Sequence, residues 1–463
     1  MTVDRTMSPA PTTHRRVVPP RSWSLRASDV TAIVVGNAIL IGAMWIRHGS
    51  LAEMASGAGI LTAIGQLTAL YGTYLILIEL LLMSRSPWLD QLFGMDRLAA
   101  AHRWIGFGAL WLLVAHGATT TVGYAFSDGS SIPGEAWTLV TTYPFVLWAL
   151  AGMGAFVLVA VTSMRAVRRR LSYETWHGLH LYAYLAVALT FAHQLAVGAD
   201  FTDDPVARLY WIGLYVSAVT TLLVFRFGQP IRLSLRHRLR VANVVREGPG
   251  VVSIYLAGRE LDRLAIRSGQ YLVCRFLTRD GWWRGHPFSI SAAPNGQWLR
   301  VTVKDLGDDT QRLQRIAPGT PVYVEGPYGA LTGARRTRSR VLLIAGGIGI
   351  TPLRALLEDL PARPGELTLV YRARRPRDIV FRDELDAIAR TNGAVLHYLV
   401  GRRDSRELPG DPLAADGLAA LVPDVRQRDV YLCGPVEMMD AVRRSLGLLG
   451  VPAAQIHAER FAY

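Results

Sequence analysis

Cysteine is almost absent from this sequence, which has only Cys274 and Cys433 in 463 residues. Two isolated thiols cannot build a disulfide framework, and they lack the spacing of a zinc or iron–sulfur site. Residues 1–27 also lack the apolar core and small-residue cleavage site of a secretory signal peptide. We expect this basic, proline-rich segment to be a flexible tail on the cytoplasmic side.

Acidic residues are in the minority, with 36 Asp and Glu against 50 Lys and Arg and a net charge of +14. A strongly basic chain can attract nucleic acid. Here much of the arginine lies in short loops between apolar runs, and Arg232, Arg236 and Arg238 follow the last run, where anionic lipid headgroups attract basic groups. We therefore expect a lipid bilayer as a partner and no nucleic acid.

Long apolar runs fill the first half of the chain, and hydrophobic residues make up 51% of the whole. A helix needs about 20 apolar residues to cross a bilayer. Six runs are long enough, at residues 28–46, 59–83, 102–123, 138–163, 178–198 and 207–227. They predict a six-helix transmembrane bundle over residues 28–228.

The loop charges predict the orientation of the bundle, because Lys and Arg accumulate on the cytoplasmic side. Basic residues cluster before the first run and after the second and fourth, at Arg15, Arg16, Arg21, Arg26, Arg85, Arg97, Arg103, Arg165, Arg168, Arg169 and Arg170. The opposite loops carry acidic residues, at Asp128, Glu135, Asp200, Asp203 and Asp204. We expect a multi-pass protein of the cell membrane with both termini in the cytoplasm.

Four histidines lie in two of the apolar runs, His102 and His116 in one and His180 and His193 in the other. Ionisable groups inside a membrane are rare and usually functional. A helical rise of about 1.5 Å per residue separates the two histidines of each run by roughly 20 Å. Two such helices side by side predict two bis-histidine haems, an inner one on His102 and His180 and an outer one on His116 and His193. The alternative is that the histidines are structural, and we assign that role to His177.

Beyond about residue 230 the sequence changes to short β-branched runs separated by glycine and proline, such as Val251–Ala257 and Tyr271–Leu277. Short strands at this spacing predict a small antiparallel β-barrel over residues 232–333. Within it lies the strand-like segment His286-Pro287-Phe288-Ser289-Ile290. Residues 304–310 open a helix whose free N–H groups can receive a phosphate.

Alternating strands and helices follow over residues 338–463, which predicts an α/β domain with a parallel sheet. The strand at residues 341–345 leads into Gly346-Gly347-Ile348-Gly349, where a glycine turn lets the backbone approach a pyrophosphate. A later strand ends in Cys433-Gly434-Pro435.

The second strand of this domain, at residues 367–371, lacks the terminal acidic residue expected for binding a free ribose hydroxyl. It is followed instead by Arg372, Arg374, Arg375 and Arg377. Guanidinium groups suit a 2′-phosphate. The pattern therefore favours NADPH over NADH, and the alternative is a solvated basic loop.

Taken together, these motifs resemble the ferric reductase and NADPH oxidase superfamily in its compact bacterial form. The resemblance includes Tyr173-Glu174-Thr175-Trp176 ahead of His180, as well as His193-Gln194. It covers nearly all of the chain after the tail, as a transmembrane haem domain followed by a flavin module of the ferredoxin-NADP reductase type. The expected architecture is a multi-domain membrane protein.

The resemblance implies a role for each motif. FAD would contact His286, Pro287, Phe288, Ser289 and Ile290, and its pyrophosphate would meet Gly307 and Thr310. The nicotinamide nucleotide would contact Gly346, Gly347, Gly349, Thr351, Pro352, Arg372, Arg374, Gly434 and Pro435. Ser289, beside the reactive flavin nitrogen, and Cys433, beside the nicotinamide, would act in catalysis. Tyr463 would stack on the flavin, with Phe461 as the competing candidate. One departure is that His286 stands where many soluble relatives have arginine, a feature common in the oxidase and ferric reductase branch.

The implied activity is electron transfer from cytoplasmic NADPH or NADH through FAD and two b-type haems to an acceptor on the outer side. Ferric chelates, oxygen, quinones and a periplasmic or membrane redox partner all remain open as acceptors. Two other readings stay open as well. The membrane half can be an electron-delivery subunit for a partner protein, or a haem-free anchor for a flavin reductase.

Overall fold

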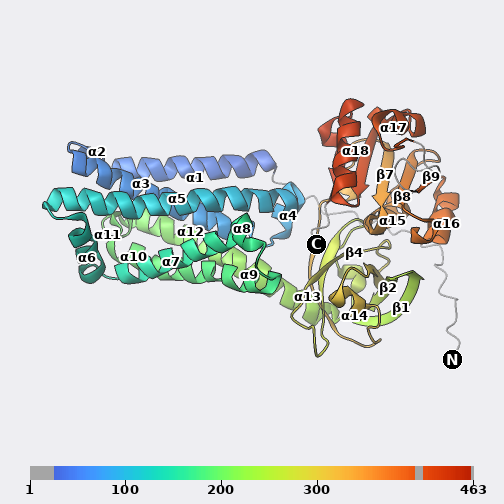
Figure 1. Cartoon of the computed structure of the whole chain (residues 1–463), viewed down its shortest axis with the longest axis horizontal. Helices are drawn as coiled ribbons and strands as arrows, with labels where there is room; N and C mark the ends of the chain where they lie inside the picture. The colour runs from blue at the N-terminus through green and yellow to red at the C-terminus, as the bar shows by residue number, and fades with distance from the viewer. Residues whose placement is uncertain (1–25, 49, 402–409, 460–463) are drawn as a thin grey trace. The chain divides into compact units, whose positions relative to one another are not determined.

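The structure, a computed structural model, describes residues 26–48, 50–401 and 410–459. It divides into two compact units (Figure 1). A helical unit contains the described residues up to Ser86 together with Arg97–Arg226. A second unit contains Pro87–Asp96 and the described residues from Phe227 onward.

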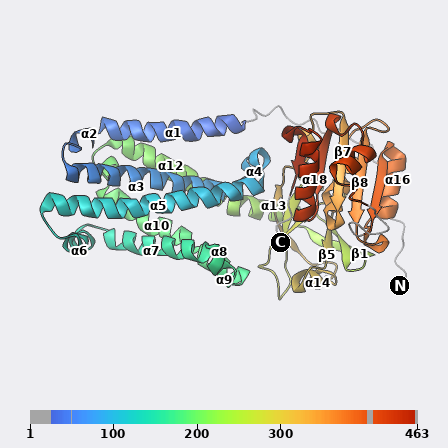
Figure 2. The ribbon, with the colours of Figure 1, turned by 45° about the horizontal axis from the view of Figure 1, so that its top comes forward.

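The helical unit is a bundle whose long helices run side by side in both views (Figures 1 and 2). Its elements are α1 (Ala27–Arg47), α2 (Ser50–Glu53), α3 (Gly57–Leu82), α5 (Met95–Asp128), α6 (Ile132–Thr142), α7 (Val146–Ser163), α8 (Arg165–Arg168), α9 (Tyr173–His180), α10 (Tyr182–Val197), α11 (Ala199–Thr202) and α12 (Pro205–Leu223). Among the described residues, six segments are long and apolar enough to cross a membrane: Ala27–Arg47, Gly57–Leu82, Arg97–Asp128, Val146–Ser163, Glu174–Val197 and Pro205–His237. The six predicted apolar helices are thus confirmed.

The predicted fourth run, 138–163, was wrong at its start. Residues 138–142 end the separate helix α6, and α7 begins only at Val146. Pro144 explains the break, because a proline disfavours helical backbone in the residue before it. Tyr143 is accordingly extended, with ψ at 134°, and Phe145 adopts a left-handed conformation with φ at 64°.

Small residues let α3 approach α5 closely. A Cβ atom on Gly65 would lie 2.3 Å from Oγ1 of Thr120, so no larger residue fits there. Elsewhere in the bundle, α1, α3 and α12 share an apolar core that includes Ile41, Leu77 and Trp211. The unit therefore holds α3 between α12 on one side and α5 on the other.

The second unit continues from the last apolar helix through a π-helical turn at Val224–Gly228 and α13 (Gln229–His237). Its first part contains β1 (Arg240–Gly248), β2 (Val251–Ala257), β3 (Tyr271–Phe276), β4 (His286–Ser289), β5 (Trp298–Lys304), α14 (Asp308–Leu313) and β6 (Val322–Tyr328). These strands form two antiparallel sheets of order β1-β2-β5 and β4-β3-β6, linked by isolated bridges at Arg240–Pro321 and Ile290–Val301. The predicted antiparallel strands are confirmed, whereas closure into a barrel stays a prediction.

A short helix from the loop between the second and third apolar helices packs on this part of the unit. In α4 (Pro87–Phe93), the buried carboxylate of Asp90 accepts a hydrogen bond from Gly329 N at 2.6 Å. Arg335 donates to the carbonyl of Leu92 at 3.1 Å. From the sequence, this segment is predicted only as a basic loop.

The last part of the unit is a parallel sheet of order β11-β10-β7-β8-β9. Its elements are β7 (Arg340–Gly346), α15 (Ile350–Asp359), β8 (Leu367–Ala373), α16 (Arg382–Asn392), β9 (Val395–Val400), α17 (Ala415–Leu421), β10 (Arg428–Cys433), α18 (Val436–Leu448) and β11 (Ile456–Ala458). One apolar core contains Leu353 of α15 and Leu385 of α16, and the other contains Leu418 of α17 and Met439 of α18. Helices therefore cover both faces of the sheet, and the predicted parallel sheet is confirmed.

A buried arginine joins the antiparallel part of the second unit to the parallel-sheet part. Arg300 of β5 has a side chain only 2% exposed and donates to both carboxylate oxygens of Glu384 on α16, at 2.7 and 2.9 Å. Its guanidinium group also lies over the Phe381 ring, 4.6 Å from the centroid. Arg354 of α15 donates to the same carboxylate at 2.9 Å.

Glu384→Gln is expected to destabilise the second unit by about 3 kcal/mol, because it leaves the buried charge of Arg300 without a carboxylate. Burial alone would raise the pKa of Glu384, but Arg300 and Arg354 outweigh that effect and hold its pKa below the usual value. The contribution of Glu384 to the free energy of unfolding is therefore complete at pH values above the ordinary carboxyl pKa. It is lost as the pH falls through the lowered pKa of Glu384 in the folded protein.

Thermal unfolding of the purified full chain, followed by tryptophan fluorescence at several pH values, measures the effect. Glu260→Gln is the matched control, because Glu260 pairs with Arg236 at an exposed site and should leave the transition unmoved. Equal transitions for wild type and Glu384→Gln at neutral pH would contradict the prediction.

Candidate functional site

The four predicted histidines come from three helices of the helical unit. α5 carries His102 and His116, α9 ends at His180, and α10 carries His193. The rings of His102 and His180 lie edge to face with centroids 5.8 Å apart. His116 and His193 lie close enough to interact electrostatically. The structure therefore brings His102 to His180 and His116 to His193, and which of the two pairs is the inner one stays a prediction.

Three of the four histidines have a polar group of the protein at the Nδ1 atom. The carboxylate of Glu79 on α3 contacts Nδ1 of His102. Nδ1 of His116 donates to the carbonyl of Gly65 at 3.0 Å. Nδ1 of His180 lies 3.3 Å from the hydroxyl of Ser163, which also accepts a hydrogen bond from the Trp176 indole. Bonds at Nδ1 fix the ring and leave Nε2 available to a metal.

This arrangement fits haem. Metal–imidazole bonds of about 2 Å on opposite sides of one ion place the two ring centroids roughly 6 Å apart, close to the 5.8 Å of the inner pair. Among the described residues, no three His, Cys, Asp or Glu side chains form a metal-binding group. A zinc site takes three or four protein ligands, whereas a haem iron needs only its axial ligands from the protein.

The helices that carry the histidines are also sparsely covered by protein. In the most apolar stretch of each helix, 33% of residues are buried in α3, against 11% in α5 and 6% in the segment α9–α10. Large apolar side chains such as Trp104 and Phe107 of α5 are exposed. The faces of α5 and α10 thus leave surface for an apolar macrocycle or for lipid.

His177 and Trp176 lie beside the inner pair. The Trp176 ring lies 5.0 Å from the ring of His180 and 6.4 Å from that of His177. Arg168 lies over the same indole, 4.7 Å from its centroid. His177 therefore belongs to an aromatic contact rather than to a histidine pair.

The predicted flavin segment forms β4 and pairs with β3 in the register Cys274–His286 and Tyr271–Ser289. His286 stacks on Phe288 with ring centroids 5.8 Å apart. Burial, aided by Arg284 and Arg275, lowers the pKa of His286. Pro287 is exposed and Ile290 is fully buried.

The Ser289 hydroxyl is buried and has no hydrogen-bond partner among the described residues. An unsatisfied buried hydroxyl is costly unless a ligand completes it. The site therefore fits a ring that offers a hydrogen-bonding atom, as a flavin does.

Gly307 and Thr310 flank the start of α14. Gly307 has φ at 150° and open space where a side chain would be. The Thr310 hydroxyl accepts from Leu306 N at 2.7 Å and donates to the Gly307 carbonyl at 3.0 Å, so it shapes this turn.

The glycine turn follows β7 at the position where the order of the parallel sheet reverses, with β8 on one side and β10 on the other. Ligands of open α/β sheets bind at such switch points, outside the carboxyl ends of the strands. A Cβ atom on Gly349 would lie 2.4 Å from the carbonyl oxygen of Cys433. The ends of β7 and β10 therefore meet with no room for a side chain.

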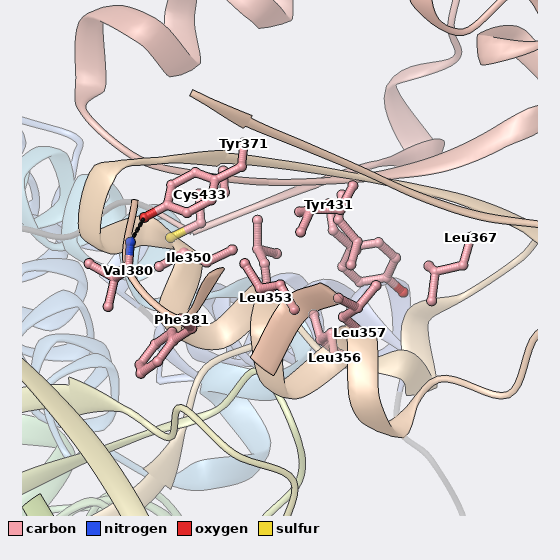
Figure 3. Packing of buried hydrophobic residues seen from close by; sticks show 14 of the residues in the cluster. Ile350, Leu353, Leu356, Leu357, Leu367, Tyr371, Val380, Phe381, Tyr431 and Cys433 are labelled. Carbon is pink, nitrogen blue, oxygen red and sulfur yellow. Dashed lines mark hydrogen bonds between the residues drawn. The ribbon is translucent and has the colours of Figure 1, made fainter. Parts of the chain in front are cut away.

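Cys433 ends β10 with its side chain in the buried cluster between the sheet and α15 (Figure 3). Burial, with the nearby Glu459, raises the pKa of its thiol well above the usual value. Gly434 and Pro435 continue from it into α18, and Thr351 and Pro352 are buried in the first turn of α15. These surroundings favour the protonated thiol, so its catalytic role stays a prediction.

Tyr371 was not identified from the sequence as a site residue. Its hydroxyl donates to the Gly347 carbonyl at 3.1 Å and accepts from Val380 N at 3.2 Å (Figure 3). Burial raises the pKa of Tyr371 to about 12, so the phenol stays protonated. Its position directly before the arginine cluster is the only signal in the sequence.

Glu79 was also not identified from the sequence as a site residue. Its signal there is clearer, because it is an acidic residue inside an apolar run.

The arginines at the end of β8 and directly after it differ in their contacts. Arg372 donates to the Leu399 carbonyl at 3.3 Å and is half-buried. Arg374, Arg375 and Arg377 are exposed. Arg374 is therefore better placed than Arg372 to bind an anionic ligand. Tyr463 and Phe461 lie outside the described residues.

Three segments of the chain match known families. Residues 68–191 match the ferric reductase like transmembrane component, residues 237–332 match an FAD-binding domain, and residues 343–444 match an oxidoreductase NAD-binding domain.

Several relatives are similar to part of the chain. It is 30% identical over 241 residues to the glycine betaine monooxygenase reductase subunit of Chromohalobacter salexigens, a match covering 49% of the chain and 64% of that relative. It is 31% identical to ferredoxin–NADP reductase B of Sorangium cellulosum, covering 38% of the chain and 77% of that relative. The FAD/NAD binding domain of a nitric oxide dioxygenase from Vibrio cholerae O1 biovar El Tor aligns at 25% identity and a TM-score of 0.42, over 49% of the chain and 98% of that structure. The chain thus spans less than two thirds of the first of these relatives.

Gly349→Ala is expected to weaken nicotinamide dinucleotide binding about tenfold, because the added methyl overlaps backbone atoms of β10 and overpacking of this kind costs roughly 1–3 kcal/mol. Titration of the purified protein with NADP⁺, followed by flavin difference absorbance, measures the affinity. Gly447→Ala in α18, which meets no atom within 4 Å, is the control and should bind as wild type does. Unchanged affinity in Gly349→Ala would contradict the assignment of this turn.

Proposed function

Because the chain belongs to the ferric reductase and NADPH oxidase-like family, in which a ferric-reductase-like transmembrane component is joined to an FAD- and NAD-binding module, we propose that it carries electrons from cytoplasmic NADPH to an acceptor on the outer side of the membrane. The family makes it an NAD(P)H-dependent oxidoreductase. The proposed route runs through FAD and two b-type haems, one on each histidine pair.

The observation that carries this proposal is the pairing of the histidines, with His102 against His180 and His116 against His193. Two axial histidines saturate an iron and favour electron transfer over binding of a substrate at the metal. Histidines with a structural role would need only hydrogen-bond partners for their ring nitrogens. Such a role gives no reason for two histidine pairs along the same two helical segments.

When bound, FAD supplies two-electron hydride chemistry and haem supplies one-electron transfer. The residues of this chain bind and orient these groups. Ser289 would offer its unpaired hydroxyl to the flavin, and the turn held by Tyr371 would receive the dinucleotide. Cys433, as a buried protonated thiol, would contribute shape beside the nicotinamide and not covalent chemistry.

The topology proposed from the loop charges places the basic loops and both termini in the cytoplasm. NADPH is then the donor on the side of the inner pair. Ferric iron and oxygen are the proposed acceptors beyond the outer pair, with a quinone or a redox partner protein as the other outcomes. Asp204 gives little support for attraction of iron, because it pairs with Arg47 and caps α12.

A reduced-minus-oxidised spectrum of the purified protein is expected to show a b-type haem absorbance after NADPH addition. His116→Ala or His193→Ala should abolish delivery to ferric chelate and oxygen while NADPH still reduces the flavin, since each change removes an outer ligand. His102→Ala and His180→Ala should do the same, and His177→Ala is the matched control that should retain delivery.

Parallel assays of ferrous iron and superoxide identify the acceptor. Wild-type protein without a b-type absorbance would support a haem-free anchor for a flavin reductase and overturn the proposal. Full delivery in His116→Ala would also overturn it. Haem that accepts electrons but reduces neither small acceptor would indicate an electron-delivery subunit for a partner protein.

Arg374→Ala is expected to raise the KM for NADPH about tenfold and leave that for NADH unchanged, because one charge-assisted contact to a 2′-phosphate contributes roughly 1.5–3 kcal/mol. Steady-state flavin reduction with both donors measures it. Arg444→Ala on α18 is the control for loss of one exposed positive charge. An equal effect on both donors would argue against a 2′-phosphate contact.

A further inference from the structure

The two histidine pairs have chemically different surroundings. The Glu79 carboxylate contacts Nδ1 of His102. The other groups at Nδ1 are neutral: the Gly65 carbonyl and, at 3.3 Å, the Thr120 hydroxyl for His116, and the Ser163 hydroxyl for His180. Nδ1 of His193 is buried without a hydrogen-bond partner among the described residues. Among these contacts, a carboxylate therefore reaches only the inner pair, and the groups at Nδ1 of His116 in the outer pair are neutral.

The contact between Glu79 and His102 is built into the packing of α3 against α5. The Glu79 side chain is 10% exposed, and Gly106, one turn after His102, leaves space for it. A Cβ atom on Gly106 would lie 3.6 Å from the Glu79 Oε2 atom, at ordinary contact distance. A buried acidic side chain in an apolar helix is costly unless it is paired, so the histidine is its natural partner.

We propose that Glu79 is a positioning residue that holds the midpoint potential of the inner haem below that of the outer haem. The proposal rests on the proposed function, because it requires haem on both pairs. A carboxylate placed at Nδ1 of an axial histidine makes that ligand a stronger electron donor. Its negative charge also favours the ferric over the ferrous state. Neutral hydroxyl and carbonyl groups do this less.

The consequence is a direction for electron transfer. With haem bound to both pairs, the electron lost by the inner group would be the one gained by the outer group, and no proton or ligand would be exchanged. A lower inner potential would make this transfer favourable from the cytoplasmic side outward. Glu79 would thereby act through His102 on the driving force, without touching a reacting atom.

Spectroelectrochemical titration of the purified full chain tests the proposal. In Glu79→Gln the distribution of one electron between the two haems is expected to shift at least tenfold toward the inner haem. For a one-electron couple this corresponds to a rise of about 59 mV in the midpoint potential of the inner haem. The low-spin ferric EPR signal of the inner haem should shift as well, and His180→Ala, which removes only the inner haem, assigns the signals.

Glu135→Gln is the matched control. Glu135 is also a buried carboxyl of the helical unit, but it accepts a hydrogen bond from Ser130 instead of contacting a histidine. Neither haem potential should change in this variant. An equal shift in Glu135→Gln and Glu79→Gln would overturn the proposal, because it would be an effect of total charge.

A second variant covers the case in which Glu79→Gln loses the inner haem. Thr120→Asp places a carboxylate beside Nδ1 of His116 and should lower the potential of the outer haem by at least the same tenfold factor. Two bound haems with unchanged potentials in Glu79→Gln, or an unchanged outer potential in Thr120→Asp, would overturn the proposal. Wild-type protein without haem would instead defeat the proposed function itself.

Discussion

An imidazole ring inside an apolar helix bundle has two polar nitrogens, and water is not available to satisfy them. This constraint organises the helical unit. α3 runs alongside α5 and serves both of its histidines, with the Glu79 carboxylate at His102 and the Gly65 carbonyl at His116. Glu79 and Gly65 are 14 residues apart on α3, and their partners His102 and His116 are also 14 residues apart on α5. Gly65 is required for a second reason, since any side chain there would overlap Thr120. The close packing of α3 and α5 thus places a polar group of α3 at Nδ1 of both rings.

The predicted nucleotide-binding turn after β7 also depends on a glycine that leaves no room for a side chain. Gly349 allows the turn after β7 to touch the backbone of Cys433, and the Tyr371 hydroxyl ties the same turn to the segment after β8. Three neighbouring strands therefore fix one short loop at the point where the sheet order reverses. A loop held in this way presents backbone N–H groups in a constant position, which is what recognition of a pyrophosphate requires.

Local pattern was enough to predict the six apolar helices, the antiparallel strands and the glycine turn, because each follows from hydropathy period or from glycine and proline placement. The start of the fourth helix was missed although Pro144 marks it in the sequence. Other features depend on residues far apart along the chain. The packing of α4 on β6 through Asp90 and Gly329, and the contact of Arg300 with Glu384, join segments with no common local signal. The site residues themselves were proposed by type and spacing, but their Nδ1 partners required the tertiary structure.

The charges of the helical unit are distributed unevenly with respect to the histidines. Two acidic residues near the predicted outer end are occupied locally, since Asp204 pairs with Arg47 and Glu135 accepts from Ser130. Glu79 alone among the contacts described above brings a carboxylate to an imidazole, and it does so at the predicted inner end. With haem on both pairs, as proposed, the inner site would have a carboxylate beside one ligand, whereas the groups at Nδ1 of His116 in the outer site are neutral. The two sites would then differ in potential although both use histidine ligands. That difference would come from α3, whose Glu79 and Gly65 meet the two histidines of α5 with a carboxylate at one position and a neutral carbonyl at the other.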